Sequence, residues 1–443
     1  MSPIKIHAIK LAATGAPGTG IPAPLRAADA HWRWSNLLWA PHRLGFFLGL
    51  VVLSSASLWW TLVQTDRLAS YLHWSIAVSP TLVHASVMVL GFFPLFFGGF
   101  LFTAGPKWLN VQQPEARQVL APLLAQTLGW LLWLVGAQVH TGLALSGLAL
   151  AALGLCWTTA IFWRMVRRSA APDQLHARLI ALACTIGCLC LLGLLGSLLL
   201  DAQDAARACV FSALWGFVML VFVTVAHRMI PFFTSSAMPL VALWRPFWVL
   251  WLMVAMVGAE AASGWLELLL QHSAWGTAWL SLLGLVELLV GAVLVWLAVV
   301  WGLVQSLKNR LLAMLHIGFV WLGLALLLAG STRLLSLLLG TQVLPLGALH
   351  ATTMGCLASL LLAMVTRVSC GHSGRALVAD NMLWSLFWAL QVATLLRLAA
   401  SFQSALTPWL LPATALVWLT VMALWSVRLG SWYGRARADG RPG

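Results

Sequence analysis

The sequence predicts an all-α, polytopic membrane protein of about twelve transmembrane helices, and three observations support this fold class. Of the 443 residues, 61% are hydrophobic and only 8% are charged, whereas a soluble domain carries roughly 25% charged residues. The apolar residues form stretches of roughly 20, which is the length that an α-helix needs to cross a bilayer. The basic residues lie mostly in short loops between these stretches. Because a soluble chain of this composition would expose large apolar patches, we expect the lipid bilayer to surround it.

The chain divides into one membrane domain and two flanking segments. We predict a mobile basic N-terminal tail over residues 1–42, a single twelve-helix domain over 43–430 and a basic C-terminal tail over 431–443. The first forty residues lack the compact apolar core of a signal peptide. The least marked helix boundary lies at 139–141, where few polar residues interrupt the apolar pattern. The predicted spans are 44–63, 76–104, 119–139, 141–163, 177–200, 207–229, 246–264, 276–304, 311–330, 342–366, 381–401 and 408–429.

The positions of the basic residues support the number of spans and predict an orientation. With both termini in the cytoplasm, 21 of the 25 Lys and Arg residues fall on the inner side. Cytoplasmic loops are enriched in these residues, so we expect both termini to be cytoplasmic. The formal net charge of +14 does not indicate nucleic-acid binding, because the basic residues form no continuous stripe. The four outer exceptions are Arg67, Arg207, Arg333 and Arg397.

Several common chemistries find no support in the sequence. There is no phosphate-binding lysine loop, no dinucleotide-binding glycine motif and no His-Glu-x-x-His zinc motif. The seven cysteines form neither Cys-x-x-Cys nor the Cys-x-x-Cys-His of covalent haem attachment. Most of them lie within apolar stretches, where cysteine behaves as a small buried hydrophobic residue. Nucleotide-driven transport and hydrolysis are therefore disfavoured.

Two histidines in the outer half of the membrane are the main candidates for chemistry. His84 and His350 each lie about eight residues, or roughly 12 Å, into a predicted span. Each is followed four residues later by a methionine, Met88 and Met354 respectively. Residues at this spacing share a helix face, and imidazole and thioether groups bind haem iron and copper. The alternative is that each histidine only hydrogen-bonds a neighbouring helix and that the methionine spacing is accidental.

Other ionisable residues gather toward the inner face. His227, His316 and His372 could form a second, inner site, although His227 could also be an interfacial residue beside Arg228. Glu287 is the only carboxylate predicted well inside a span, where it either relays protons or pairs with an arginine. The remaining inner histidines are interpreted as solvated, namely His7, His31, His42 and His176.

Five stretches of the chain resemble the NnrS family, and together they extend from about residue 41 to residue 397. The resemblance implies a twelve-helix bacterial inner-membrane protein that contains haem and copper and acts in denitrification or in defence against nitric oxide. His84, His316, His350 and His372 occupy the family's histidine positions, and Arg228, Pro231, Thr366, Arg367 and Gly371 fall in its motif positions. The five stretches are Pro41–Phe47, His84–Met88 leading to Gly98–Trp108, His227–Thr234, Leu315–Phe319, and Leu349–Gly355 leading to Met364–Arg375.

One position departs from the family pattern. The family usually shows His-x-His followed shortly by Met in the second helix, but the second of these positions is Ser86. Serine is a far weaker ligand than imidazole for copper or haem iron. The protein therefore either lacks one metal or recruits Met88 or His73 in place of the missing histidine.

We therefore predict an inner-membrane protein with non-covalent b-type haem, and with copper as a second candidate metal, that binds or handles nitric oxide. The competing hypotheses are a transporter for a metal, haem or small anion, and an electron carrier that accepts electrons from quinol. Enzymatic turnover, as a haem-dependent oxidoreductase acting on nitric oxide, is left open. The candidate cofactor-binding residues are His84, His350, His316, His372, Arg228 and Arg367, and the candidate metal ligands are His84, His350, His316, Met88, Met354 and His227.

Overall fold

The computed structural model describes residues 31–71, 76–238, 240–241, 243–271 and 273–441. His7, His73 and His272 lie outside these residues, so the proposed recruitment of His73 stays a prediction. Within the described residues the chain is helical and contains no β-strand. Two elements are too short to cross a membrane, the 3₁₀-helix η1 (Trp34–Trp39) and α11 (Leu303–Ser306).

Twelve helices of the described chain are long and apolar enough to cross a membrane, which confirms the predicted fold class. The boundary at 139–141 is also confirmed, because the His140 side chain caps the new helix by accepting a hydrogen bond of 3.0 Å from the backbone N–H of Gly142. The spans are α1 (Pro41–Ala69), α2–η2–α3 (Pro80–Leu109), α4 (Ala116–Val139), α5 (Thr141–Arg168), α6 (Leu175–Leu199), α7–η3–α8 (Gln203–Ala237), α9 (Phe247–Leu270), α10 (Ala274–Val300), α12 (Arg310–Leu339), α13–η4–α14 (Gly347–His372), α15 (Asn381–Ala400) and α16 (Thr407–Tyr433).

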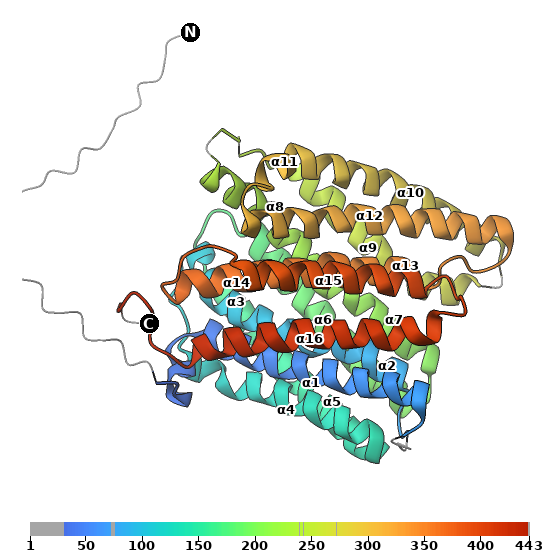
Figure 1. Cartoon of the computed structure of the whole chain (residues 1–443), viewed down its shortest axis with the longest axis horizontal. Helices are drawn as coiled ribbons and strands as arrows, with labels where there is room; N and C mark the ends of the chain where they lie inside the picture. The colour runs from blue at the N-terminus through green and yellow to red at the C-terminus, as the bar shows by residue number, and fades with distance from the viewer. Residues whose placement is uncertain (1–30, 72–75, 239, 242, 272, 442–443) are drawn as a thin grey trace, which may run out of the picture.

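Three spans form the centre of the bundle, and each contains a π-helical segment. The helices run roughly along the longest axis of the molecule (Figure 1). The most apolar windows of α2–η2–α3, α7–η3–α8 and α13–η4–α14 are 83%, 89% and 72% buried, against 39–67% for the other nine spans. The π segments are η2 (Val87–Gly91), η3 (Leu214–Met219) and η4 (Ala351–Ala358). Two of these central spans carry His84 and His350.

Glycines bring two pairs of outer helices into backbone contact. In α4 against α5, and in α10 against α12, a Cβ added at these glycines would lie 2.9 Å or less from the partner helix. Without a hydrophobic force between helices in lipid, small residues that permit close approach hold such pairs together. No convincing sequence repeat relates the two halves of the chain, yet both halves use glycines seven residues apart. They are Gly129 and Gly136 with Gly147 and Gly154, and Gly284 and Gly291 with Gly323 and Gly330.

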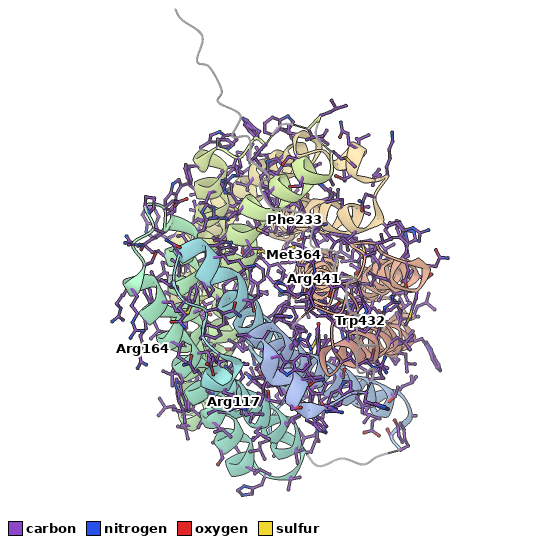
Figure 2. The ribbon with its side chains drawn as sticks, turned by 90° about the vertical axis from the view of Figure 1, so that its left-hand side faces the viewer. Arg117, Arg164, Phe233, Met364, Trp432 and Arg441 are labelled. Atoms are coloured by element: carbon purple, nitrogen blue, oxygen red, sulfur yellow. The ribbon has the colours of Figure 1, made fainter. Side chains whose placement is uncertain are left out.

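The segments before α1 and after α16 meet at one end of the bundle. The Trp32 indole donates a hydrogen bond of 2.9 Å to the Gly430 carbonyl, and the Asn36 amide donates one of 2.8 Å to the Gly434 carbonyl. Figure 2 looks onto this end, where Arg117 and Arg164 also lie. The described parts of both predicted tails, residues 31–42 and 431–441, thus contact each other and the helices. This is the end that the loop charges predict to be cytoplasmic.

Candidate functional site

The two outer-half histidines occupy equivalent places near the start of two central spans. The His84 ring stacks on the Trp60 indole of α1, with 3.9 Å between ring centroids and 14° between planes. Its Nδ1 is buried, and no described group hydrogen-bonds it. The Nδ1 of His350 lies 2.8 Å from the Leu346 carbonyl, which can only accept, so this nitrogen carries the proton. The Nε2 of His350 therefore keeps a free lone pair, as in histidines that bind metals.

The two imidazoles lie within electrostatic range of each other and of basic side chains. His84 interacts with His350, Arg397 and Arg67, and His350 also interacts with Arg397. The Arg67 guanidinium lies 5.4 Å from the centroid of the Trp60 ring. Sequence reasoning missed Arg67, Arg397 and Trp60 as parts of this site. Arg67 and Arg397 were two of the four basic residues on the outer side, and that exception was the signal that could have found them.

A π-helical segment follows each of these histidines. The segment η2 begins three residues after His84, and η4 begins immediately after His350. Such segments are frequent at functional sites, because the wider turn changes the direction of the side chains that follow. Each His–Met interval therefore spans a change of helix type, and α-helical spacing no longer determines whether Met88 and Met354 share a face with the histidine. Met88 is half-buried and Met354 is buried.

The inner histidines do not form the three-residue site that the sequence suggested. The His227 Nδ1 lies 3.1 Å from His176 Nε2, whereas the His316 Nε2 lies 2.9 Å from the Thr234 hydroxyl. The His372 ring packs on His42 at 4.4 Å between centroids. Across the described chain, no three His, Cys, Asp or Glu side chains lie close enough to hold a metal ion.

The interpretation of His42 and His176 as solvated residues was wrong. Their side chains are only 4% and 2% exposed. His42 is covered because residues 430–437 fold back onto the start of α1, where Arg43 donates hydrogen bonds to the carbonyls of Tyr433 and Arg435. His176 is covered by α8 through its contact with His227. Both lie at helix ends, where the local sequence does not report burial by distant segments.

Comparison with known families decides the family of this chain. A family model described as NnrS protein matches residues 36–437. The chain belongs to the NnrS family. This family is linked to the response to nitric oxide. No curated protein matches the chain.

The position at which the resemblance led us to expect a second histidine holds a serine whose hydroxyl both donates and accepts a hydrogen bond. The Ser86 side chain is fully buried. Its hydroxyl donates to the Val83 carbonyl and accepts from the Trp133 Nε1, both at 3.1 Å. Because Trp133 is also fully buried, an imidazole at position 86 would have to displace this indole. Position 86 therefore contributes a packing hydrogen bond to Trp133.

Arg228 and Arg367, which the resemblance assigned to motif positions, lie toward the inner ends of their spans, away from His84 and His350. Arg367 follows His350 by 17 residues on one continuous span, a distance of roughly 25 Å along the axis. Its guanidinium lies 4.0 Å from the Phe233 ring centroid, and that of Arg228 lies 5.1 Å from the Trp108 ring centroid. A single haem at the outer pair therefore cannot also contact these arginines.

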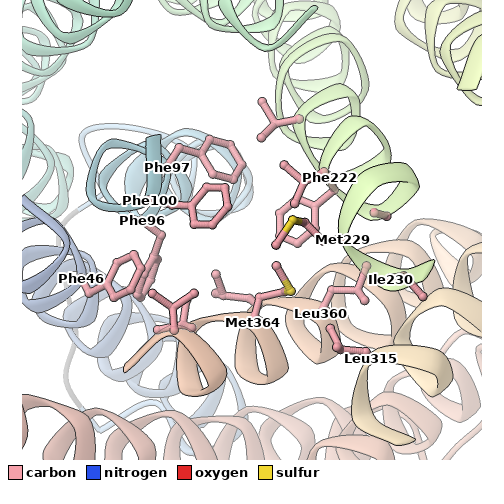
Figure 3. Close-up of a pocket in the computed structure, with 16 residues that line it drawn as sticks. Phe46, Phe96, Phe97, Phe100, Phe222, Met229, Ile230, Leu315, Leu360 and Met364 are labelled. Atoms are coloured by element: carbon pink, nitrogen blue, oxygen red, sulfur yellow. The ribbon is translucent and has the colours of Figure 1, made fainter. Parts of the chain in front are cut away.

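An apolar pocket lies in the inner half of the bundle beside these arginines. It comprises about 610 Å³ of empty space, a large part of which is open to the exterior. Figure 3 shows Met229 from α8 and Met364 from α14 pointing into it, opposite the phenyl rings of α3. Arg228 and Arg367 are sequence neighbours of lining residues, so they lie beside the inner end of the cavity. The lining is entirely apolar: Phe46, Phe96, Phe97, Phe100, Val221, Phe222, Val225, Ala226, Met229, Ile230, Leu315, Leu360, Leu361, Met364, Val365 and Val368.

The residues around the outer pair suit a haem better than a bare metal ion. Two imidazoles with free nitrogens could bind a haem iron. A planar indole already stacks beside His84, and the two nearby arginines would pair with propionates. The same two positive charges would disfavour a bare copper cation, and among the described residues no third His, Cys, Asp or Glu side chain lies close enough to complete a metal site with this pair.

Proposed function

We propose that this protein binds a non-covalent b-type haem between His84 and His350 in the outer half of the membrane and binds nitric oxide there. The observation that carries the proposal is the pair of imidazoles within electrostatic range of each other, one with an unpartnered buried Nδ1 and the other with its Nδ1 directed at the Leu346 carbonyl. A haem bound there would supply iron, to which nitric oxide binds in place of one of the two imidazoles. The protein would act in the bacterial inner membrane, in nitrosative-stress defence or denitrification.

Each side chain has a distinct role under this proposal. His84 and His350 hold the iron, and the Leu346 carbonyl fixes the tautomer and ring orientation of His350. Arg67 and Arg397 neutralise the propionates, which otherwise carry two negative charges into a region of low dielectric constant. Met88 and Met354 are the nearest thioether donors along the same two spans.

The inner residues would provide a route for nitric oxide rather than bind the iron. Nitric oxide is small and neutral, and an apolar cavity stays free of competing water. The cavity lies on the same two spans as His84 and His350 but nearer the inner face, since Phe96 and Leu360 lie ten or more residues, roughly 15 Å, further along. It would hold gas at the inner end of a route to the outer pair. His227 and His316, through their bonds to His176 and Thr234, fix α8 at one side of the cavity. His372 orients the segment after α14.

Haem content and optical spectra of the purified full chain test the proposal. We expect a Soret band and about one haem per chain, a spectral shift on addition of nitric oxide, and loss of the band in both His84→Ala and His350→Ala. The matched control is His140→Ala, which removes an exposed histidine at the same end of the bundle, between α4 and α5. Full haem content in both pair variants would refute the site.

The same preparation distinguishes the competing functions. Metal analysis reports copper, to which the proposal assigns no site. A colourless, metal-free protein that catalyses counterflow of a metal or anion would establish a transporter instead. Reduction of the haem by a quinol analogue on a physiological timescale would identify quinol as the electron donor.

A further inference from the structure

Three carboxylates and one arginine form a cluster in the outer half of the membrane, far along the chain from His84 and His350. We call it the outer carboxyl cluster; its members are Glu260 and Glu267 of α9, Glu287 of α10 and Arg333 of α12. The Arg333 guanidinium donates two hydrogen bonds to Glu287, at 3.0 and 3.1 Å, and one to Glu267 at 3.1 Å. Of the two predicted alternatives for Glu287, pairing with an arginine is confirmed.

Burial in this cluster rises steadily from the surface inward. The side chains of Glu267 and Arg333 are 44% and 19% exposed, whereas Glu287 is fully buried and Glu260 is 2% exposed. Glu267 also lines a polar hollow of about 1190 Å³, much of it open to the exterior, together with Asp204 and Arg207. A continuous set of ionisable groups thus leads from water at the outer face to two carboxyls inside the bundle.

The charges in the interior do not balance if every carboxyl is ionised. The charged groups that face Glu260 are Glu287, Arg333 and Glu267. One guanidinium neutralises one negative charge, and both of its bonds to the interior go to Glu287. Glu260 Oε1 is buried, and no described donor bonds it. A second buried carboxylate without a donor is so costly that it takes up a proton instead.

We propose that Glu260 and Glu287 form a proton-binding site inside the membrane, loaded from the outer aqueous phase through the hollow and Glu267. A hydronium ion in the hollow gives its proton to the carboxylates and is left as a water molecule. The proton comes to rest on one carboxyl oxygen and is shared between Glu260 and Glu287 by a hydrogen bond. This step forms and breaks no bond between heavy atoms and transfers no electron. The residues Glu260 and Glu267 lie seven apart on α9 and so share a helix face, which aligns the path.

The geometry favours a proton over a metal cation. A calcium or similar ion needs six or more oxygen ligands arranged around one point. The three carboxyls of the cluster do not converge into a metal-binding group. A proton needs only two oxygens that face each other. This site is independent of the proposed haem function, since none of its members takes part in that site.

Carbodiimide labelling tests the proton site, because hydrophobic carbodiimides react with protonated carboxyls in apolar surroundings. The purified full chain is treated with dicyclohexylcarbodiimide at a series of pH values, and the labelled residue is identified by mass spectrometry. We expect one adduct per chain, on Glu260 or Glu287, that declines as the pH rises. In Glu260→Gln the remaining Glu287 pairs with Arg333 and stays ionised, so labelling should fall at least tenfold. Glu115→Gln, at an exposed loop carboxyl, is the control and should label as the wild type does.

A measurement on the wild type guards against misfolding of the variant. Infrared spectroscopy should show a protonated-carboxyl band that shifts in D₂O, and Glu267→Ala should slow this exchange severalfold. The absence of both the band and an adduct in the folded wild type overturns the proposal. Suppression of labelling by sodium ions at constant pH would instead identify a metal-cation site. An unchanged exchange rate in Glu267→Ala overturns the entry route.

Discussion

The contact between α4 and α5 makes Gly136→Ala a demanding test of how this bundle is packed. A Cβ at position 136 would lie 2.3 Å from the backbone nitrogen of Ala144 and 2.6 Å from its Cα. Both atoms belong to the backbone, so no side-chain rotation can relieve the overlap. To reach an ordinary contact of 3.4 Å, the start of α5 must move away by about 1.1 Å. The connection between the two helices is the single residue His140, which leaves little slack.

The magnitude follows from two opposed effects. Alanine improves helix propensity by about 1 kcal/mol relative to glycine. Overpacking costs typically 1–3 kcal/mol or more, and separation of the helices also weakens the contacts at Gly129, Gly147 and Gly154. We expect a net loss of about 1–2 kcal/mol in the free energy of unfolding. The matched control is Gly196→Ala in α6, where an added Cβ meets no atom within 4 Å. The control should gain up to about 1 kcal/mol.

Equilibrium unfolding in mixtures of mild detergent and SDS measures both variants against the wild type. We expect the free energies of unfolding of the two alanine variants to differ by about 1–3 kcal/mol, with Gly136→Ala the less stable. Equal stability of the two variants, or a gain in Gly136→Ala, would refute the interpretation that backbone contact at these glycines holds the helix pair.

Three further outcomes are expected. Arg333→Gln leaves the buried Glu287 carboxylate without its cation and should destabilise the protein by about 3 kcal/mol, seen as a lower unfolding temperature at neutral pH that recovers partly when acid protonates the carboxyls. Ser86→His restores the histidine of the family pattern, but because the site is fully buried it should lower thermal stability without raising bound copper in metal analysis. Two hydrogen bonds from the adjacent guanidinium of Arg437 hold the pKa of Asp439 at about 2. A carboxyl whose pKa is lowered in the folded state stabilises the fold at every pH above its ordinary pKa, and this stabilisation is lost only as the pH falls toward the lowered pKa. Hydrogen-exchange protection of residues 434–441 should therefore stay constant from pH 8 to about pH 4.

The position of Ser86 bears on how members of one family can differ. Trp133 of α4 donates to this hydroxyl, so the second span is fixed to α4 where a second imidazole would otherwise stand. The outer site of this chain then depends on His84 and His350, with His350 contributed by a span 266 residues further along. If the wild-type protein contains haem but no copper, the serine at position 86 is a sufficient reason for the absence of copper.

The sequence by itself determined the twelve spans. Span length is a local property, because roughly 20 apolar residues in a row must form a helix wherever they lie in lipid. The predicted depth of His84 and His350, about eight residues into their spans, was wrong: the spans begin at Pro80 and Gly347, so the two histidines lie only four and three residues from the start. The sequence also placed an acid, Glu287, at membrane depth and left its partner open.

Only the tertiary structure decided which of these residues meet. Neighbouring helices in the bundle are often distant in sequence, so the pairing of Glu287 with Arg333, of His227 with His176 and of His316 with Thr234 could not be read from local pattern. His42 was misjudged because it is buried by residues near 433, at the other end of the chain. Burial and charge balance depend on every element that packs around a group, and spacing along one helix reports only what that helix contributes.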